Sequence, residues 1–421
     1  MKIAFVVPRF FPYRGGQENY VLKLGQQLNL QGHRVSVLTS TAFDLESFWI
    51  PGFRTLPAGC EKVGGIEVRR FPISYHKWVR RAGRLLAYSP HWRWKARYSA
   101  PGFCVKGLTA ALRKLRPDVI HIGPLPYTRI MYEALDEGLR CGARVIATPC
   151  VHFGEDNSGA VARYYTRDFQ MRLLNECQAV LTMTDMERLR LAEMGVDGRK
   201  IRTTAHGIDI EEAMGGVAER FRRRWNLSGP IVVQLGTKTE DKGTITVVEA
   251  MKSLWAQGSK AWLVLAGAST GSFEDYIRGQ QNLPCLLNLA PVNEEEKRDL
   301  LAATDIMVHP SRVESLGIVY LEAWANAKPV IAADTAASRA VITRDGDGLL
   351  VPFGDSVATA DAIRQLLGDP AERQRLGTAG REKVLSKYSW GVILPKIIEV
   401  FSGKDLDSEF ESRPDRSAVA R

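Results

Sequence analysis

Short runs of apolar, often β-branched residues alternate with segments of helical periodicity along most of the chain. Between the first two runs, Val21, Leu24 and Leu28 recur at helical spacing, and Gly32 stands where such a helix would end. The runs expected to form strands are 3–7, 34–39, 66–71, 119–122, 144–148, 179–182, 201–203, 231–236, 262–267, 285–289, 306–309, 330–333 and 348–351. Strands that alternate with helices predict an α/β fold with parallel sheets covered by helices.

The length of the chain predicts two domains, because 421 residues exceed the size at which one hydrophobic core usually stops growing. The alternation breaks near the middle, at a Gly-Gly pair followed by a run of arginines. We therefore expect an N-terminal Rossmann-like domain over 1–206, a linker or hinge over 207–230 and a C-terminal Rossmann-like domain over 231–388. A last helix, about 389–402, could pack back on either domain, and the charged, Ser- and Pro-containing end, 404–421, is expected to be disordered.

Cysteine usage and apolar patterning bear on the compartment. The six cysteines are scattered, without a C-x-x-C pair or a histidine at metal spacing, which favours reduced thiols in cytoplasm. The apolar run 3–7 is shorter than a secretory signal and is closed by Pro8, so it is expected to be a first strand. No apolar stretch approaches the roughly 18 residues of a spanning helix. The sequence thus predicts a cytoplasmic protein that is soluble or peripheral at the inner membrane face.

The net charge of +10 is concentrated in one segment, since no acidic residue lies between Glu67 and Asp118. The segment carries basic residues interleaved with aromatic ones: Arg69, Arg70, Lys77, Trp78, Arg80, Arg81, Arg84, Tyr88, Trp92, Arg93, Trp94, Lys95, Arg97, Tyr98, Lys106, Arg113, Lys114 and Arg116. Such a segment suits an anionic membrane surface, where each Lys or Arg adds about 1 kcal/mol and aromatic rings settle at the headgroups. A solvated loop or helix face explains it equally well, and nucleic acid is a weaker third alternative that we do not expect.

The most informative motif is the segment 309–323, in which an expected strand ends at His309 and a helix is expected to begin near Leu316 or Gly317. The first backbone N–H groups of a helix have no partner inside it and, with the helix dipole, form a site for a diphosphate. Glu322 lies about five residues into the helix, roughly 7 Å along its axis, where a ribose would lie. Glu314 precedes the helix, where a carboxylate can accept hydrogen bonds from sugar hydroxyls.

Two glutamates eight residues apart are common, so their surroundings decide the interpretation. Glu322 stands inside an apolar run, where an uncompensated carboxylate is energetically expensive. This favours a ligand for Glu322 over a solvated helix position.

In its P-S-x-x-E-S-x-G setting, the pair Glu314 and Glu322 resembles the E-x7-E motif of glycosyltransferase family four, retaining enzymes of the GT-B fold. The likeness extends over most of the chain, through pieces that are individually weaker: the loop 12–16, the turn 206–209, the stretch 236–243, and Ser389-Trp390 at the start of the final helix. The resemblance implies two Rossmann-like domains that face each other across a cleft, and a final helix that crosses back to the first domain. It also implies a nucleotide-diphosphate sugar donor, with no metal and no cofactor.

Carried over residue by residue, the resemblance assigns Glu314 to hydroxyls of the donor sugar and Glu322 to the ribose. The amides of Leu316, Gly317 and Ile318 would hold the diphosphate. In the stretch that begins at Gly236, Lys242 matches a lysine that neutralises phosphate, although an ordinary turn lysine is the alternative. The family usually has Arg where this chain has Thr237, and Lys238 is the candidate to supply the missing charge, as a point charge rather than a bidentate fork.

Three further residues are assigned by position after a strand. Gly15 and Gly16 permit close approach of backbone to a ligand, or form only a tight turn. His152 resembles the histidine that reaches the donor sugar from the first domain, against the alternative of a structural histidine. The stretch 334–340 departs from the family, which usually carries Gly-Gly and a later Glu there.

The Asp345-Gly346-Asp347 triplet resembles a D-x-D metal motif, but turn residues before a strand explain it, so we predict no metal site. The expected function is a metal-independent, retaining hexosyltransferase that moves a sugar from a UDP, GDP or ADP donor to a glycan or lipid-linked acceptor in cell-surface polysaccharide or glycolipid assembly. Helix-start amides and lysines would stabilise charge on the leaving diphosphate. The alternatives are a sugar-nucleotide epimerase of similar build and a non-catalytic nucleotide-sugar-binding protein.

Overall fold

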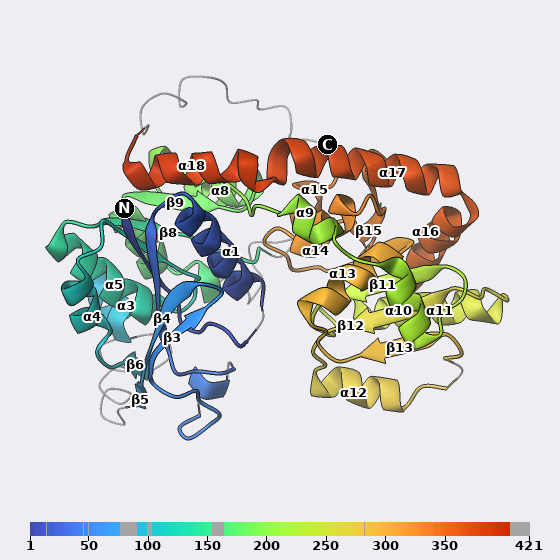
Figure 1. The fold of residues 1–421 in the computed structure, drawn as a ribbon, viewed down its shortest axis with the longest axis horizontal. Helices are drawn as coiled ribbons and strands as arrows, with labels where there is room; N and C mark the ends of the chain where they lie inside the picture. The colour runs from blue at the N-terminus through green and yellow to red at the C-terminus, as the bar shows by residue number, and fades with distance from the viewer. Residues whose placement is uncertain are drawn as a thin grey trace. The chain divides into compact units, whose positions relative to one another are not determined.

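The computed structural model describes residues 1–404 except 14, 45, 49, 76–90, 99–102, 154–163 and 282 (Figure 1). The chain divides into two compact units. The first comprises 1–151, 163–204 and 394–421, and the second comprises 152–162 and 205–393. The terminal segment from 405 onward and, within the basic segment, residues 76–90 and 99–102 lie outside the described residues.

The first unit is built on an eight-stranded sheet in the order β10-β9-β8-β7-β1-β2-β4-β3. Its strands are β1 (Lys2–Val6), β2 (Arg34–Ser40), β3 (Gly59–Val63), β4 (Ile66–Phe71), β7 (Val119–Ile122), β8 (Arg144–Ala147), β9 (Ala179–Thr182) and β10 (Ile201–Thr203). All neighbours pair in parallel except β3 and β4. A separate antiparallel pair joins β5 (Ile73–Tyr75) and β6 (Phe103–Val105).

The helices of this unit are α1 (Gly16–Leu30), α3 (Trp92–Tyr98), α4 (Leu108–Leu115), α5 (Thr128–Cys141), α7 (Asp168–Glu176) and α8 (Asp185–Glu193). The apolar spacing seen in the sequence is the buried stripe of α1, since Val21, Leu24 and Leu28 are fully buried. Strand β1 is buried on both faces from Ile3 onward, as expected for a central parallel strand.

The edge strand β3 was not expected from the sequence. It forms a hairpin with β4 through Gly64 and Gly65, both at positive φ (55° and 84°). A Gly-Gly pair between two extended runs is a hairpin signal, because both central residues of such turns need positive φ. The polar residues of β3 concealed this signal, since an exposed edge strand lacks an apolar pattern.

The second unit contains a six-stranded, all-parallel sheet in the order β13-β12-β11-β14-β15-β16. Its strands are β11 (Ile231–Leu235), β12 (Trp262–Ala266), β13 (Leu286–Leu289), β14 (Ile306–His309), β15 (Val330–Ala333) and β16 (Gly348–Val351). Its helices are α9 (Ile210–Met214), α10 (Ala218–Trp225), α11 (Thr244–Ala256), α12 (Gly271–Arg278), α13 (Glu294–Ala303), α14 (Ile318–Ala325), α15 (Ala336–Arg339), α16 (Ser356–Gly368) and α17 (Pro370–Lys383).

One apolar core fixes the strand ends of the second sheet in place. It joins β11, β12, β14 and β15 to α11 and α16, with Val232, Met251, Ile331 and Ile363 fully buried. The carboxyl ends of these strands therefore sit on a rigid platform, which is where ligands bind in parallel sheets.

The stretch 207–230, expected to be a linker, instead carries α9 and α10, which belong to the second unit. Phe221 is buried, and Arg220 forms ion pairs with Asp299 and Glu295 of α13. The charged run that suggested an exposed connection is thus one face of an amphipathic helix. Whether this stretch acts as a hinge stays a prediction.

The final helix, α18 (Trp390–Ser402), begins in the second unit and continues into the first, to which it belongs from Leu394 onward (Figure 1). In the first unit, Phe401 is buried near the His121 ring, and the Arg144 Nε donates to the Val400 carbonyl at 2.8 Å. At its start, Ile208 pairs with Ser389 and the Trp390 amide donates to the Ile208 carbonyl. The segment by which the chain enters the second unit, at Ile208, therefore lies beside the segment by which it leaves, at Ser389.

Every helix in the described part of the chain is too short or too polar to span a lipid bilayer.

Candidate functional site

The site is built where β14 ends and α14 begins. His309 is the last residue of β14 and is buried. Gly317 caps α14 at φ 77°, and a Cβ at this position would lie 2.3 Å from a ring carbon of Tyr320. Both the left-handed backbone and the packed ring require glycine here. The helix start is thus held in one conformation.

The amides that open α14 are available to a ligand. Within the described residues, the backbone N–H groups of Leu316, Gly317 and Ile318 have no protein acceptor, and no side chain caps the helix. Trp324, fully buried further along α14, donates from Nε1 to the Asp347 carbonyl at 2.8 Å and anchors the helix. A rigid helix start with open amides is suited to an anion such as a diphosphate.

Glu314 lies before this helix start and is held by two basic side chains. Its Oε1 is 2.5 Å from the Lys242 Nζ and 2.9 Å from the His309 Nε2. The Lys242 ammonium also donates to the Val313 carbonyl at 3.0 Å. The Glu314 side chain is only 12% exposed, so the carboxylate is fixed in place rather than solvated.

The charge state of Glu314 follows from two opposing effects. Burial alone would raise the pKa of its carboxyl, but the charge of Lys242 and the hydrogen bond from His309 outweigh burial and lower the pKa well below 4.5. Glu314 is therefore an ionised hydrogen-bond acceptor at neutral pH.

Glu322 lies in α14 and is paired with Lys297 of α13 at 2.9 Å. Lys297 also contacts Glu294 at 2.9 Å. Burial alone would lower the pKa of Lys297, but Glu322 and Glu294 raise it. A lysine from a neighbouring helix thus compensates the charge of Glu322, so its place in an apolar run does not by itself require a ligand, and the ribose contact stays a prediction. The carboxyl is 13% exposed and does not extend into bulk solvent.

The stretch 236–243 follows β11 and packs against the loop that carries Glu314. Gly243 has φ 68°, and a Cβ there would lie 2.4 Å from the Pro310 carbonyl oxygen. The Arg312 Nε pairs with Asp241 at 2.8 Å, and the Arg312 amide donates to the Asp241 carbonyl at 3.0 Å. Gly236, at φ 128°, lies against His309. These contacts bring Gly236 and Lys242 into the same loop cluster as Glu314, and their contact with a donor stays a prediction.

Lys238 is placed differently from the expectation. Its ammonium is buried and donates to the Asn288 Oδ1 at 2.6 Å and to the Leu289 carbonyl at 2.7 Å, at the end of β13. Burial lowers its pKa, a shift that Glu274 opposes. The lysine thus ties two strand ends together, and this geometry does not favour it as the replacement for the missing arginine.

His152 clusters with the second unit, in the short stretch 152–162 of which most lies outside the described residues. Burial lowers the pKa of His152, Lys242 lowers it further, and Glu314 opposes them. Its ring is therefore within electrostatic range of the Glu314 cluster and is neutral at neutral pH.

Gly15 and Gly16 lie in the first unit, at the N-terminus of α1. A Cβ on Gly15 would lie 2.4 Å from the Glu18 Oε2, so this loop packs closely on its own helix. Their contact with a donor stays a prediction.

The Asp345-Gly346-Asp347 triplet is a turn before β16. Asp347 is buried, accepts from the Thr343 amide at 2.9 Å and forms an ion pair with Lys383. In the part of the chain that the structure describes, no group of three or more His, Cys, Asp and Glu side chains could hold a metal ion.

Three residues of this site were not assigned from the sequence. His309 and Lys297 contact the two glutamates, and Arg312 joins the two loops. His309 carried a usable signal, since it directly follows a buried strand. Lys297 carried none, because it belongs to another helix and follows three glutamates that suggest a solvated surface.

Comparison with known proteins identifies the family of both parts of the chain. Residues 218–383 match the family described as Glycosyl transferases group 1, and residues 15–207 match the Glycosyl transferase 4-like domain. The chain is 27% identical over 412 residues to a phosphatidyl-myo-inositol mannosyltransferase of Mycobacterium leprae, covering 95% of this chain and 96% of the relative. It is 26% identical over 412 residues to a GDP-mannose-dependent alpha-mannosyltransferase of Mycobacterium tuberculosis, covering 94% and 95%.

Solved structures agree on the fold. Anabaena Alr3699/HepE, in complex with UDP and glucose, superposes with a TM-score of 0.71 at 17% identity, covering 96% of this chain and 99% of that one. The predicted α/β class with two Rossmann-like, GT-B-type halves is confirmed. This chain belongs to the group 1, family-four-like glycosyltransferases, retaining enzymes of the GT-B fold that use nucleotide-sugar donors.

Proposed function

We propose that this chain transfers a hexosyl residue, with retention of anomeric configuration, from a nucleotide-diphosphate sugar to a glycan or lipid-linked acceptor. The observation that carries the proposal is the open start of α14, with Glu314 before it and Glu322 within it, both largely buried and both paired with a lysine.

The diphosphate would bind the amides of Leu316, Gly317 and Ile318. As the bond between sugar and phosphate breaks, negative charge grows on the leaving group and the sugar carbon becomes cation-like. Fixed amides and the nearby Lys242 stabilise that charge without reorganising during the reaction. Because Lys242 is also bound to Glu314 and to the Val313 carbonyl, its position is set before a ligand arrives.

The two glutamates serve different parts of the donor. Glu314 receives both basic partners on Oε1, and within the described residues its Oε2 has no protein partner. That oxygen is the proposed acceptor for a sugar hydroxyl. Glu322, held by Lys297, would accept from the ribose. Neither carboxylate is required as a nucleophile, because the leaving phosphate can take the proton of an acceptor that attacks from the same face.

The nucleobase is best tested directly. One full-length relative is named for GDP-mannose, whereas the solved structure from Anabaena holds UDP. A thermal-shift panel of UDP-, GDP- and ADP-sugars should show stabilisation by one class, because a ligand that binds only the folded state raises its stability. If no nucleotide sugar of any class raised the unfolding temperature, the proposed function would be wrong.

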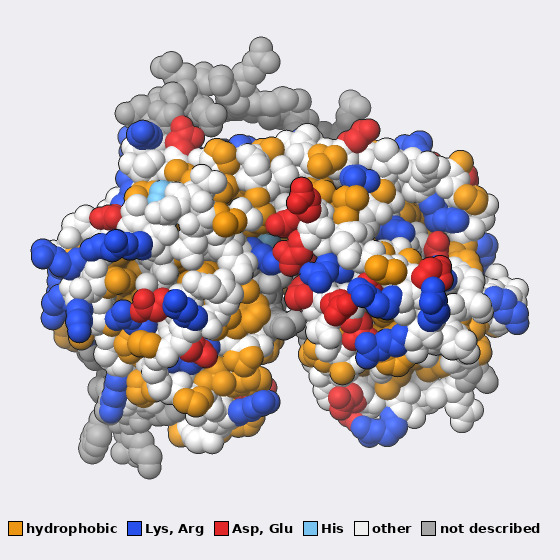
Figure 2. Space-filling model, in the orientation of Figure 1, with side chains coloured by type: hydrophobic (Ala, Val, Ile, Leu, Met, Phe, Trp, Pro, Cys, Tyr) orange, Lys and Arg blue, Asp and Glu red, His pale blue; other side chains and the backbone are white. Residues whose placement is uncertain are grey.

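The acceptor is proposed to lie at an anionic membrane surface. In the described part of the basic segment, α3 exposes Trp94 (49% exposed) beside Arg93, Lys95 and Arg97. Arg113, Lys114 and Arg116 end α4, over which Figure 2 shows Lys and Arg side chains gathered. The relative that acts on a phosphatidyl-myo-inositol supports a lipid acceptor.

Sedimentation with vesicles of phosphatidylglycerol tests this surface. We expect binding at low salt that weakens as salt rises, and less binding by an Arg93→Gln, Trp94→Ala double variant. Vesicles of phosphatidylcholine alone are the control. Equal sedimentation of wild type and variant would leave the basic segment as a solvated face.

The epimerase alternative predicts a different product. An epimerase would convert the donor with no acceptor present, so incubation of the preferred nucleotide sugar alone discriminates. A transferase returns the donor unchanged apart from slow hydrolysis, and a non-catalytic binding protein shows no turnover with acceptor-containing lipid extract either.

A further inference from the structure

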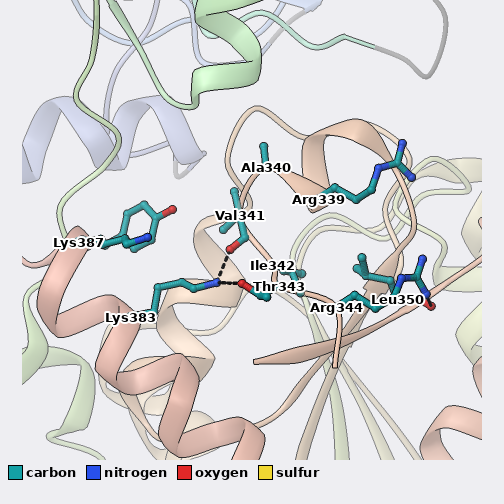
Figure 3. Close-up of a pocket in the computed structure, with 10 residues that line it drawn as sticks. Arg339, Ala340, Val341, Ile342, Thr343, Arg344, Leu350, Lys383 and Lys387 are labelled. Atoms are coloured by element: carbon teal, nitrogen blue, oxygen red, sulfur yellow. Dashed lines mark hydrogen bonds between the residues drawn. The ribbon is translucent and has the colours of Figure 1, made fainter. Parts of the chain in front are cut away.

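A cavity of about 400 Å³ lies in the second unit, away from the residues assigned to the donor (Figure 3). One wall is the loop 339–344, between α15 and β16, and the other is the segment 383–388 at the end of α17. Four of the ten lining residues are basic and none is acidic: Arg339, Arg344, Lys383 and Lys387. The cavity is therefore lined by one sign of charge.

The nearby carboxylates neutralise only part of this charge. Arg339 and Arg344 share Asp334, through an Nη1 to Oδ1 contact of 2.8 Å and an Arg344 contact to the other oxygen. Lys383 is satisfied by the Val341 carbonyl at 3.0 Å, by the Thr343 hydroxyl at 2.9 Å and by Asp347. Within the described residues, two carboxylates, Asp334 and Asp347, form the ion pairs of three of these cations, and Lys387 forms none, so the lining keeps a net positive charge.

The excess charge is positioned to meet a ligand. Arg339 contacts the Asp334 carboxylate through Nη1, and the Arg344 Nη1 also donates to the Leu350 carbonyl at 3.2 Å. Each guanidinium has further N–H groups beyond these contacts, and both side chains are about half exposed. The exposed Lys387 stands on the other wall. Guanidinium forks and a lysine point charge are the groups that bind phosphate oxygens best.

The two walls come from different parts of the chain: one connects β15 to β16, and the other leads into α18. The segment 384–388 is a π-helical turn, and its last carbonyl, of Tyr388, accepts from the Ile208 amide at 2.6 Å. It directly precedes α18, which continues into the first unit. π-helical turns are frequent at functional sites. A ligand in this cavity would contact both the β15–β16 connection and the segment from which the chain crosses over.

We propose that this cavity binds a phosphate-bearing ligand, held by Arg339, Arg344 and Lys387. The site is distinct from the proposed diphosphate site, since neither Lys242 nor the amides of Leu316, Gly317 and Ile318 line it. The shared chemistry is a phosphate monoester or diester, from a soluble metabolite or from a lipid headgroup.

Calorimetric titration with inorganic pyrophosphate tests the site. To suppress binding at the start of α14, the titration uses the Lys242→Ala protein as background. Adding Lys387→Glu or Arg344→Gln is expected to weaken pyrophosphate binding roughly fivefold or more. Adding Lys260→Glu, a charge reversal at an exposed lysine of the same unit, should leave it unchanged.

A second measurement separates the two phosphate sites. Lys387→Glu in the otherwise native protein should leave the thermal shift produced by UDP or GDP unaltered, whereas Lys242→Ala should reduce it. Equal pyrophosphate affinity of the Lys387→Glu and Lys260→Glu proteins would overturn the proposal. Lys387 is exposed, whereas Arg344 pairs with Asp334, so the Lys387 substitution disturbs fewer contacts of the folded protein.

Two further binding measurements distinguish the possible sources of the phosphate group. Glycerol 3-phosphate represents soluble esters, and phosphatidylglycerol vesicles represent headgroups. A loss of binding by Lys387→Glu in one arm supports the proposal and names the source. Unchanged binding of Lys387→Glu in both arms, with unchanged pyrophosphate affinity, contradicts it.

Discussion

The Lys242 ammonium lies 2.5 Å from the Glu314 Oε1, across two loops that follow different strands of the second sheet. The His309 Nε2 shares the same oxygen at 2.9 Å. One carboxylate oxygen thus takes both basic groups, and the site holds a fixed anion beside a fixed cation. In the proposed reaction, a donor would meet these two groups already in place.

Lys242→Met should shift the acidic limb of the pH profile of kcat/KM to higher pH, by about 1–3 units. Without the lysine, only His309 opposes the effect of burial, which raises the pKa of Glu314. The carboxylate is therefore protonated at a higher pH than in the wild type. The profile is measured with the preferred donor, and Lys260→Met serves as control. A limb at its wild-type position would show that Glu314 does not titrate in it.

The pair Lys242 and Glu314 also affects the free energy of unfolding. Because the folded pKa of Glu314 is below its usual value, its contribution to the free energy of unfolding is present above about pH 4.5 and is lost as pH falls through the folded pKa. Lys242→Met should remove part of that contribution at neutral pH, measured as a lower midpoint of urea unfolding.

Glu322→Gln should weaken nucleotide-sugar binding by roughly ten- to a hundredfold, as expected for loss of a charged acceptor. The fold should persist, because Lys297 keeps its contact with Glu294. Glu294→Gln is the matched control, since it removes the other carboxylate from the same lysine and should leave affinity near wild type. Calorimetry on the three proteins gives the comparison, and equal losses for both variants would place the effect on Lys297 rather than on a ribose.

Much of the fold could be predicted because its signals are local. Buried parallel strands are short apolar runs, and helix α1 shows its apolar stripe in the spacing of three residues. The E-x7-E segment is also local, since strand end, loop and helix start follow one another within 15 residues. The family and the fold that it implied are confirmed.

The rest depends on contacts between distant residues. Lys297 reaches Glu322 from another helix, and nothing around either residue indicates the pair. Lys238 and Lys242 are four residues apart in one loop, yet one is buried against Asn288 and the other contacts Glu314. Composition does not determine which way a loop lysine points. The basic segment is only partly within the described residues, so its role stays a prediction.

In the first unit, Glu187 should make the free energy of unfolding depend on pH. The fully buried carboxylate accepts from the Val151 and Met183 amides, each at 2.8 Å, beside the stretch that leads to His152. Burial raises its pKa to about 7, although the two amides oppose the shift. Cys150, which is half-buried, lies close enough to interact with it.

Because the folded pKa of Glu187 is above its ordinary value, its contribution to stability is fully present below about pH 4.5 and is lost as pH rises through 7. The wild type should lose up to about 3 kcal/mol of unfolding free energy from this group between those limits. Glu187→Gln should abolish that slope. Urea unfolding at pH 5, 6, 7 and 8 measures it, and an equal slope in both proteins would refute the assignment.

Gly207 and Trp390 come from two of the sequence pieces that resemble the family, and the structure packs them against each other. A Cβ on Gly207 would lie 2.3 Å from the Cδ2 of the Trp390 indole, which is buried. The indole has little room to move, because the Trp390 amide is bonded to the Ile208 carbonyl and Ile208 pairs with Ser389. Gly207→Ala should therefore displace the ring and lower the free energy of unfolding by about 1–3 kcal/mol.

Gly391→Ala is the matched control for this overpacking, one residue beyond the tryptophan. Its Cβ would meet no atom closer than the Ser389 hydroxyl at 3.9 Å, and it lies in the first turn of α18. Alanine favours a helix over glycine by up to about 1 kcal/mol, so this variant should be as stable as wild type or more so. The two variants are compared by thermal unfolding. If both variants shifted the unfolding midpoint in the same direction, the destabilisation by Gly207→Ala would not come from its clash with the indole. The contact between the start of α18 and the turn 206–209 would then not have the stabilising role assigned to it.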